Sequence, residues 1–115
     1  MSPIETIEVG RRDGFDLRFE FYPENMHPAD SFDDTVCDLK EIMYKIETGQ
    51  WTWFWVKCVA SINGVDLGDD SLGGCLYDSY EQFVDENGYS EDMIELALKE
   101  ARQNTSAIIE KALTG

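Results

Sequence analysis

The residues best suited to chemistry are acidic side chains gathered in two intervals that contain no lysine or arginine. The longer interval, between Lys57 and Lys99, has 41 residues and ten of them are Asp or Glu. The shorter interval runs from Phe19 to Leu39. Interspersed lysines would pair with such acids at i,i+4 spacing, and without them the acids repel one another and destabilise the fold. We interpret the acids as a surface for a basic partner, against the simpler interpretation of a solvated face that maintains solubility.

Two sets of these acids are the predicted partner-binding residues. The first set lies at expected turns and helix starts and comprises Asp66, Asp69, Asp70, Asp78, Asp85, Glu86, Glu91 and Asp92. The second set, in the shorter interval, comprises Asp33 and Asp34. Carboxylates on a rigid scaffold can pair with lysine and arginine, and the pairing is bidentate where the partner residue is arginine.

Three tryptophans form a second candidate surface. Trp51, Trp53 and Trp55 alternate along the chain, so they share one face of the strand expected at 51–62. Such a stripe either packs in the core under a helix or anchors a protein interface, where tryptophan and tyrosine are enriched. Stacking on single-stranded bases is disfavoured, because the domain has the wrong charge for a nucleic acid.

Little in the sequence indicates catalysis or a cofactor. The single histidine, His27, lies in a loop between Pro23 and Pro28, and no local pattern joins it to a cysteine as a base and nucleophile. The glycine-rich stretch 72–75 lacks a lysine and lies among acids, the wrong field for a phosphate. Neither group of acids near residues 66–70 or 85–88 has the spacing of a calcium loop. We expect no enzymatic activity, no cofactor and no metal site.

Composition limits the remaining classes. The 115 residues suit one α+β domain, 1–115, with 24 acidic and 9 basic side chains, a net charge of −15 and a pI near 4.1. This charge argues against direct binding to nucleic acid or to a membrane. The chain has no signal peptide, no apolar stretch of ~18 residues and no disulfide or zinc pattern, so we expect a cytoplasmic protein. On a globule of about 34 Å diameter, the charge per unit length would be similar to that of duplex DNA, on which fifteen charges at one per ~1.7 Å occupy about 26 Å of helix axis.

Periodicity predicts the elements of the first half of the chain. Alternation over 4–22, with a turn at Asp13-Gly14, predicts a β-hairpin. Helical spacing then predicts a helix from about residue 32, with Asp30 or Ser31 as its cap and Gly49 at its end.

The second half is predicted in the same way. A strand at 51–62 leads through Asn63-Gly64 into a return strand that glycines and aspartates break, so we expect a bulge or a wide loop before Cys75. Asp78 or Ser79 opens a short helix, with Ser79 and Gln82 as a capping box. A last helix starts at Ser90 with a buried apolar stripe that extends to Leu113. We expect the order ββαββαα and a four-stranded, mainly antiparallel sheet packed by helices on at least one face.

Several motifs resemble those of small uncharacterised proteins of bacterial phages and plasmids. They are W-x-W-x-W-V-K, N-G-V-x-L-G, L-G-G-C-x-Y-x-S-Y-x-x-F and E-D-M-I-x-x-A-L-x-x-A-R, and they cover Trp51 to Arg102. These motifs mark a fold rather than a site. In size and charge the whole chain also resembles anti-CRISPR and anti-restriction proteins, several of which imitate DNA. This second resemblance is one of class; it implies a bacterial host cell and assigns no residue a role.

The leading hypothesis is a non-enzymatic inhibitor whose carboxylates mimic DNA and block the basic nucleic-acid channel of a bacterial defence complex, such as a CRISPR effector. Electrostatic steering would make this association fast and sensitive to salt. The alternative is an immunity or adaptor protein that binds a basic toxin or another basic protein through the same acids and the tryptophans. A small enzyme is the third hypothesis and would need a deep pocket lined by converging polar groups. The sequence leaves both a monomer and a homodimer open.

Overall fold

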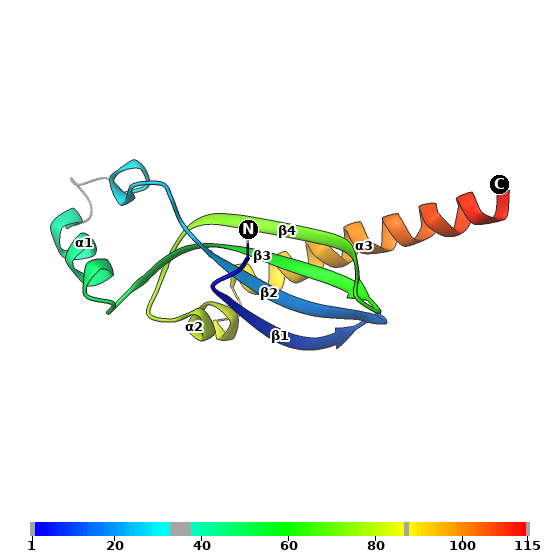
Figure 1. Cartoon of the computed structure of the whole chain (residues 1–115), viewed down its shortest axis with the longest axis horizontal. Helices are drawn as coiled ribbons and strands as arrows, with labels where there is room; N and C mark the ends of the chain where they lie inside the picture. The colour runs from blue at the N-terminus through cyan, green and yellow to red at the C-terminus, as the bar shows by residue number, and fades with distance from the viewer. Residues whose placement is uncertain (1, 33–37, 87, 115) are drawn as a thin grey trace.

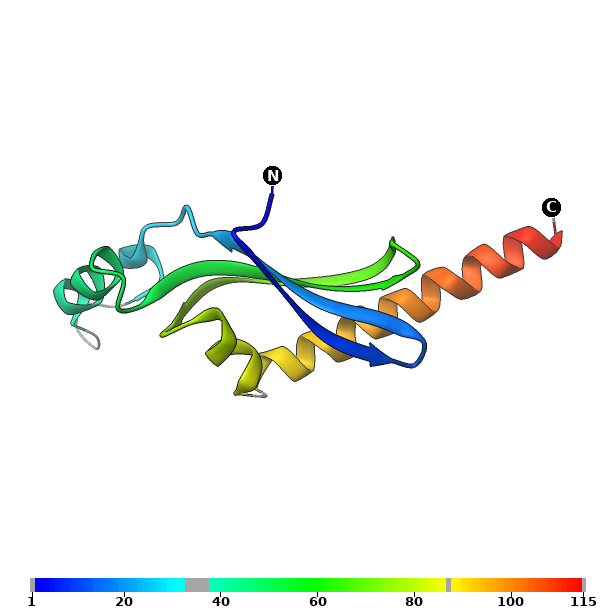
Figure 2. The same ribbon diagram turned by 60° about the horizontal axis from the view of Figure 1, so that its bottom comes forward.

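Four strands form one antiparallel sheet, and two helices cover one of its faces (Figures 1 and 2). The computed structural model describes residues 2–32, 38–86 and 88–114. The elements in chain order are β1 (Glu5–Arg12), β2 (Phe15–Pro23), the 3-10 helix η1 (Pro28–Asp30), α1 (Leu39–Glu47), β3 (Thr52–Ile62), β4 (Val65–Tyr77), α2 (Tyr80–Asp85) and α3 (Tyr89–Thr114). The strands lie in the order β1-β2-β3-β4, so each pairs with its neighbour in the sequence. The predicted α+β class and the four-stranded antiparallel sheet are confirmed.

Both predicted hairpin turns are present. Asp13 and Gly14 connect β1 to β2, and Asn63 and Gly64 connect β3 to β4. Their φ angles are all positive, at 55° and 86° in the first turn and 51° and 81° in the second. Two successive positive φ angles are typical of a type I′ turn, which Asp-Gly and Asn-Gly adopt most easily. The turns set the register, and the register decides which face of the sheet each side chain occupies.

The core lies between the sheet and helices α2 and α3. On β2, Phe15, Leu17, Phe19 and Phe21 are buried, as their alternation predicts. Phe83 of α2 is the centre of an aromatic cluster in which four neighbouring rings have their centroids 5.2–6.2 Å from its own. These neighbours are Phe19, Phe21, Phe54 and Tyr77. The cluster ties α2 and the end of β4 to the middle of the sheet.

Helix α3 lies very close to β4 at Gly68. A Cβ atom at this position would be 2.2 Å from the carbonyl oxygen of Ala97 and 2.5 Å from the amide nitrogen of Ala101. Glycine is therefore required for the observed approach of helix and strand. On either side of this contact Ile94 and Leu98 are buried.

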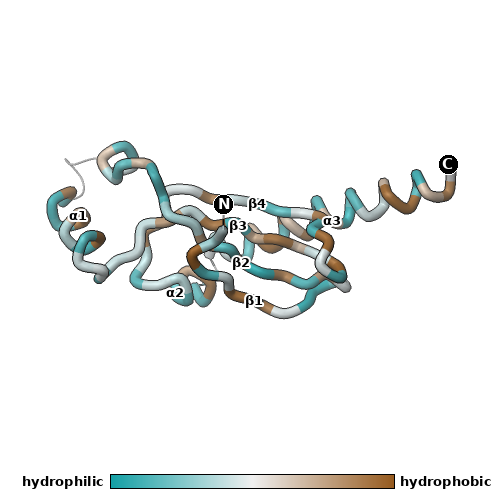
Figure 3. The backbone as a smooth tube through the Cα atoms, in the orientation of Figure 1, coloured by the Kyte–Doolittle hydropathy of each residue, from teal (hydrophilic) through white to brown (hydrophobic). Residues whose placement is uncertain are grey.

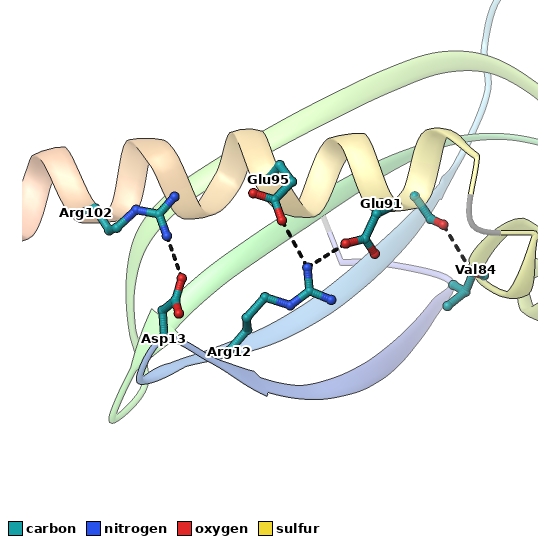
Figure 4. A network of polar contacts seen from close by, with 7 residues as sticks. Arg12, Asp13, Val84, Glu91, Glu95 and Arg102 are labelled. Atoms are coloured by element: carbon teal, nitrogen blue, oxygen red, sulfur yellow. Dashed lines mark hydrogen bonds and ion pairs between the residues drawn. The ribbon is translucent and has the colours of Figure 1, made fainter.

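Ion pairs connect the first half of α3 to the β1-β2 hairpin (Figure 4). Arg12 contacts Glu91 at 2.6 Å and Glu95 at 3.2 Å, and Arg102 contacts Asp13 at 2.6 Å. These side chains are 41–59% exposed, so solvent screening makes the contribution of each pair to stability small. Their main effect is that the basic and acidic side chains at this end of the molecule neutralise one another.

The first helix starts later than predicted. It begins at Leu39 with Asp38 as N-cap, so the predicted start near residue 32, with Asp30 or Ser31 as cap, is wrong. Asp30 is instead the last residue of η1. His27 is the N-cap of this short helix, and its Nδ1 accepts a hydrogen bond from the first N–H of the helix, so η1 is an element separate from α1. Residues 33–37, which the predicted helix includes, lie outside the described residues.

Strand β4 is continuous and contains bulges, so of the two expected alternatives the bulge is present and the wide loop is not. Its register with β3 shifts near Leu67 and near Gly74, whose φ is 64°. Such irregularities add residues and bend a strand without ending it. Strand β3 starts at Thr52, so Trp51 precedes the strand instead of opening it.

The second half of α3 leaves the sheet, contrary to the predicted burial up to Leu113 (Figure 2). The side-chain amide of Asn104 donates to the Leu67 carbonyl at 2.6 Å, and beyond it Ile108 and Leu113 are 58% and 83% exposed. We call residues 103–114 the overhang. The helix has 26 residues and is about 39 Å long. It starts beneath the middle of the sheet and extends past the edge of the sheet, so its second half has no sheet above it.

The molecule is elongated as a result. Its extents are 59 × 26 × 23 Å and its radius of gyration is 17.0 Å, against about 13 Å for a compact chain of this length. Over 59 Å, the net charge of −15 amounts to one charge per about 3.9 Å, whereas duplex DNA has one per ~1.7 Å and a single strand one per ~3.4 Å. Averaged over the long axis, the charge density is therefore lower than the expected duplex-like density.

Candidate partner-binding site

Two of the predicted acids already have a cation within the protein. Arg18 Nη2 contacts both carboxylate oxygens of Asp66 at 3.0 Å. Glu91 accepts a hydrogen bond from Arg12 at 2.6 Å. An arginine of a partner would have to compete with these contacts, so Asp66 and Glu91 are poorly suited to partner binding.

The sheet face that α2 and α3 leave open is balanced in charge. Arg18 Nε donates to Glu20 at 2.8 Å, and the Tyr22 hydroxyl donates to the same carboxylate at 2.7 Å. Burial alone would raise the pKa of Glu20, but the hydrogen bonds from Tyr22 and Arg18 outweigh it and lower that pKa. Trp55 stacks on Tyr22 with ring centroids 4.2 Å apart. Because its charges satisfy one another, this face is a weak candidate for recognition of a basic partner.

Asp69 and Asp70 lie on β4, at the edge of the sheet. Neither has an ion pair within the described part of the chain. Burial, and then the charge of Asp69, raises the pKa of Asp70. Up to about 26 Å of strand separates Asp70 from Asp78, since a strand rises ~3.3 Å per residue. The predicted acids of 66–92 therefore do not form one cluster.

A distinct group of acids surrounds the junction of α2 and α3. These acids have no ion pair among residues 2–32, 38–86 and 88–114, and they are Asp78, Asp85, Glu86 and Asp92. Three hollows of about 290, 270 and 500 Å³ meet here, and Tyr77 lines all of them. Asp78 and Glu86 line the hollow of about 270 Å³, and Glu86 and Asp92 line that of about 500 Å³.

Aromatic rings lie beside these carboxylates. Trp51 lines the hollow that holds Asp78, and Tyr89 lines the hollow that holds Asp92. We call this set the acidic–aromatic surface; it comprises Trp51, Tyr77, Asp78, Glu86, Tyr89 and Asp92. Tyr89 is 61% exposed and was not among the predicted site residues. The signal that could have indicated it is a tyrosine after a glycine, directly behind the acids at 85–86.

Local hydrogen bonds position this surface. Ser79 Oγ accepts a bond from the Gln82 N–H at 3.1 Å, as predicted, and Gln82 Oε1 accepts one from the Asp78 N–H at 2.7 Å. These two bonds fix the backbone of Asp78 at the start of α2. At the other end of α2, Ser90 Oγ donates to the Val84 carbonyl at 3.0 Å and holds the start of α3 against α2 (Figure 4).

The electrostatics of the surface favour a cation. Glu86 is the C-cap of α2, at the negative end of the helix dipole, where a carboxylate is destabilising. Burial raises the pKa of Tyr77, and the charge of Glu86 adds to the rise. Trp51 already has a cation on its ring, because Lys45 Nζ lies 4.2 Å from the ring centroid. Since Lys45 already occupies the Trp51 ring, a lysine or arginine of a partner would meet the uncompensated carboxylates together with the rings of Tyr77 and Tyr89.

The tryptophans do not form one interface stripe. Trp53 Nε1 donates to the Met26 carbonyl at 2.8 Å, and its ring lies 5.7 Å from that of Phe32. The ring of Trp55 stacks on that of Tyr22 on the open face of the sheet. All three tryptophans are half-buried, and of the three only Trp51 lines a hollow of the acidic–aromatic surface. Asp33 and Asp34, the second predicted cluster, lie outside the described residues.

The candidate catalytic residues have structural roles. His27 caps η1 through Nδ1. Cys58 and Cys75 are buried, and burial raises the pKa of each thiol to about 12, so neither forms a thiolate near neutral pH. Across the described ranges, no three His, Cys, Asp or Glu side chains are grouped to hold a metal ion.

No helix in the part of the chain described here is long and apolar enough to cross a membrane. Comparison of the chain with protein-family models, with curated proteins and with solved structures gives no match.

Proposed function

We propose that the protein is a non-enzymatic inhibitor that mimics nucleic-acid phosphates and blocks the basic DNA or RNA channel of a bacterial defence complex, such as a CRISPR effector. One observation carries the proposal: Asp78, Glu86 and Asp92 have no ion pair within the described ranges, whereas Asp66 and Glu91 are paired. The protein's own cations thus leave one acidic surface free for a partner. No cofactor takes part in this function.

The chemistry of the acidic–aromatic surface supports an arginine-rich partner. A guanidinium group can accept a carboxylate in a bidentate pair and can stack on an aromatic ring with its face. Asp78 and Glu86 lie beside Trp51, and Asp92 lies beside Tyr89, so each carboxylate has a ring near it. Channels that hold nucleic acid present arginines and lysines for the same phosphate contacts.

The shape of the molecule supports insertion into a narrow groove. Its long axis extends over 59 Å. The molecule is also narrow across its other two axes, at 26 and 23 Å. An elongated acidic body of this kind would enter a groove that a flat acidic surface could not.

The test is a pair of matched triple variants. Asp78→Asn, Glu86→Gln and Asp92→Asn together neutralise the proposed surface. Glu8→Gln, Glu47→Gln and Glu100→Gln change the net charge equally at exposed acids of β1, α1 and α3. Each tagged variant is used to capture complexes from bacterial cells that carry a CRISPR or restriction system. Binding of the captured complex is then titrated with competing single-stranded and duplex nucleic acid.

We expect the first variant to bind at least about ten-fold more weakly, since each charge-assisted contact contributes about 1 kcal/mol or more. The control should stay within about three-fold, and nucleic acid should displace the wild-type protein. Equal weakening of both variants would reduce the effect to overall charge and reject the surface. Capture of a single basic toxin that nucleic acid does not displace would reject the inhibitor and assign an immunity protein instead.

A further inference from the structure

The overhang, residues 103–114, presents an apolar face to solvent. Ile108, Ile109 and Leu113 are 58%, 55% and 83% exposed. Together with Thr105 and Ala112 they have the spacing i, i+3, i+4, i+7 and i+8, which places them on one side of the helix. Figure 3 shows apolar segments near the free end of α3, far from the rest of the apolar core.

This face continues the one that α3 buries against the sheet. Ala97 and Ala101 are fully buried, Thr105 is half-buried and Ile108 is exposed, each three or four residues after the one before it. A helical segment of about 12 residues is marginal in water unless its apolar side is packed. The overhang therefore has the pattern of a helix that is covered by another element.

Charge indicates what the covering element is. Glu110 and Lys111 are the charged residues of the overhang, so its net charge is zero in a chain of net charge −15. A basic partner gains nothing from a neutral segment. Two copies of the chain, however, can approach each other here without the repulsion that opposes contact between their acidic surfaces.

We propose that two copies form a homodimer in which the overhangs pair side by side in antiparallel orientation. A two-fold axis near Ile108 and Ile109 places the same residues of both chains at the centre, as in an isologous interface. The overhang is about 18 Å long, so antiparallel pairing keeps the two acidic bodies at opposite ends. That separation exceeds the Debye length of ~8 Å at physiological salt, whereas parallel pairing would bring the bodies together.

The interface is small. Stable dimers bury about 1,200 Å² or more, and we expect two helical segments of this length to bury less, so the dimer should be weak and dissociate on dilution. Higher salt strengthens the dimer, because it screens repulsion between the two bodies. The inference does not depend on the proposed function, and binding to a basic partner has the opposite salt dependence.

Sedimentation velocity over a range of about 1 to 200 µM protein, at low salt and at about 0.5 M salt, tests the dimer. The test variant is Ile108→Ser with Ile109→Ser, and the matched control is Leu96→Ser, an exposed leucine on another side of α3. We expect a wild-type dimer that dissociates on dilution, at least about ten-fold weaker association in the test variant and no change in the control. Circular dichroism at 222 nm should fall on dilution of the wild type as the overhang frays. A monomer at every concentration and salt, or a dimer that survives the test variant, would overturn the proposal.

Discussion

Replacement of Gly68 by alanine tests the packing of α3 on β4 most directly. The new Cβ atom would lie 2.2 Å from the Ala97 carbonyl oxygen and 2.5 Å from the Ala101 nitrogen, whereas ordinary contacts begin at 3.4 Å. Both neighbours are backbone atoms, so no side-chain rotation relieves the clash, and α3 must move by about 1.2 Å. A gap of about 1 Å already removes about half of the dispersion energy of a contact, so this shift would weaken the contacts of Ile94 and Leu98 by at least that fraction.

We expect Gly68→Ala to lower the free energy of unfolding by about 3 kcal/mol, the upper end of the range for overpacking. The corresponding fall in Tm is about 12 °C for a domain of this size, at an unfolding entropy of about 2.1 cal/mol/K per residue. Urea unfolding followed by circular dichroism and tryptophan fluorescence measures the change. The matched control is Gly73→Ala on the same strand, where the Cβ would meet only the side-chain carboxylate of Glu24, at 3.3 Å, and should cost less than about 1 kcal/mol. Equal stability of the two variants would refute the proposed contact.

Three further changes test the core and the edge strand. Asp70→Asn should raise stability at pH 7 by up to about 0.5 kcal/mol, because burial, and then Asp69, raises the Asp70 pKa and the folded state favours the protonated acid. Protonated Asp70 stabilises the fold at a pH below its pKa in the unfolded chain, and this stabilisation is lost as the pH rises through its higher pKa in the folded protein. The benefit of Asn should therefore vanish in urea titrations below about pH 4. Cys58 and Cys75 should resist iodoacetamide at pH 8 in the native protein and react in denaturant, because burial raises the pKa of both thiols to about 12. Peptide mass spectrometry measures the labelling. Labelling of the native protein at the rate of the denatured protein would contradict this. Phe83→Ala should lower the free energy of unfolding by about 3–5 kcal/mol in the same urea assay, and a loss below about 1 kcal/mol would show that the aromatic cluster is not the centre of the core.

Much of the fold was predictable because its signals are local. Asp-Gly and Asn-Gly define both hairpin turns through their own backbone preferences, and Ser79 with Gln82 defines the start of α2 within four residues. The start of α1 was not predictable in this way, since Asp30, Ser31 and Asp38 are all good N-caps and contacts of the preceding loop decide between them. The periodicity of α3 likewise shows which side is apolar, but it does not show where the sheet beneath it ends.

The candidate site was predictable only in part, for a similar reason. Residue types indicate that the surface is acidic, but availability depends on cations that are distant in the sequence. Arg18 and Asp66 are 48 residues apart, and Arg12 and Glu91 are 79 residues apart. Since the sequence does not show these contacts, it does not separate the paired acids from those of the acidic–aromatic surface.

The sequential strand order also has a consequence for how the chain folds. The β1-β2 and β3-β4 hairpins each close through two residues, whereas 28 residues, 24–51, separate β2 from β3. Closing the longer loop costs about 2 kcal/mol more in chain entropy than closing a two-residue turn, if the loop is treated as flexible. We therefore expect the two hairpins to form early and independently, with α3 docking on its neighbour β4. The pairing of β2 with β3 would then be the late step that joins them, so core substitutions on that pair should change the rate of folding most.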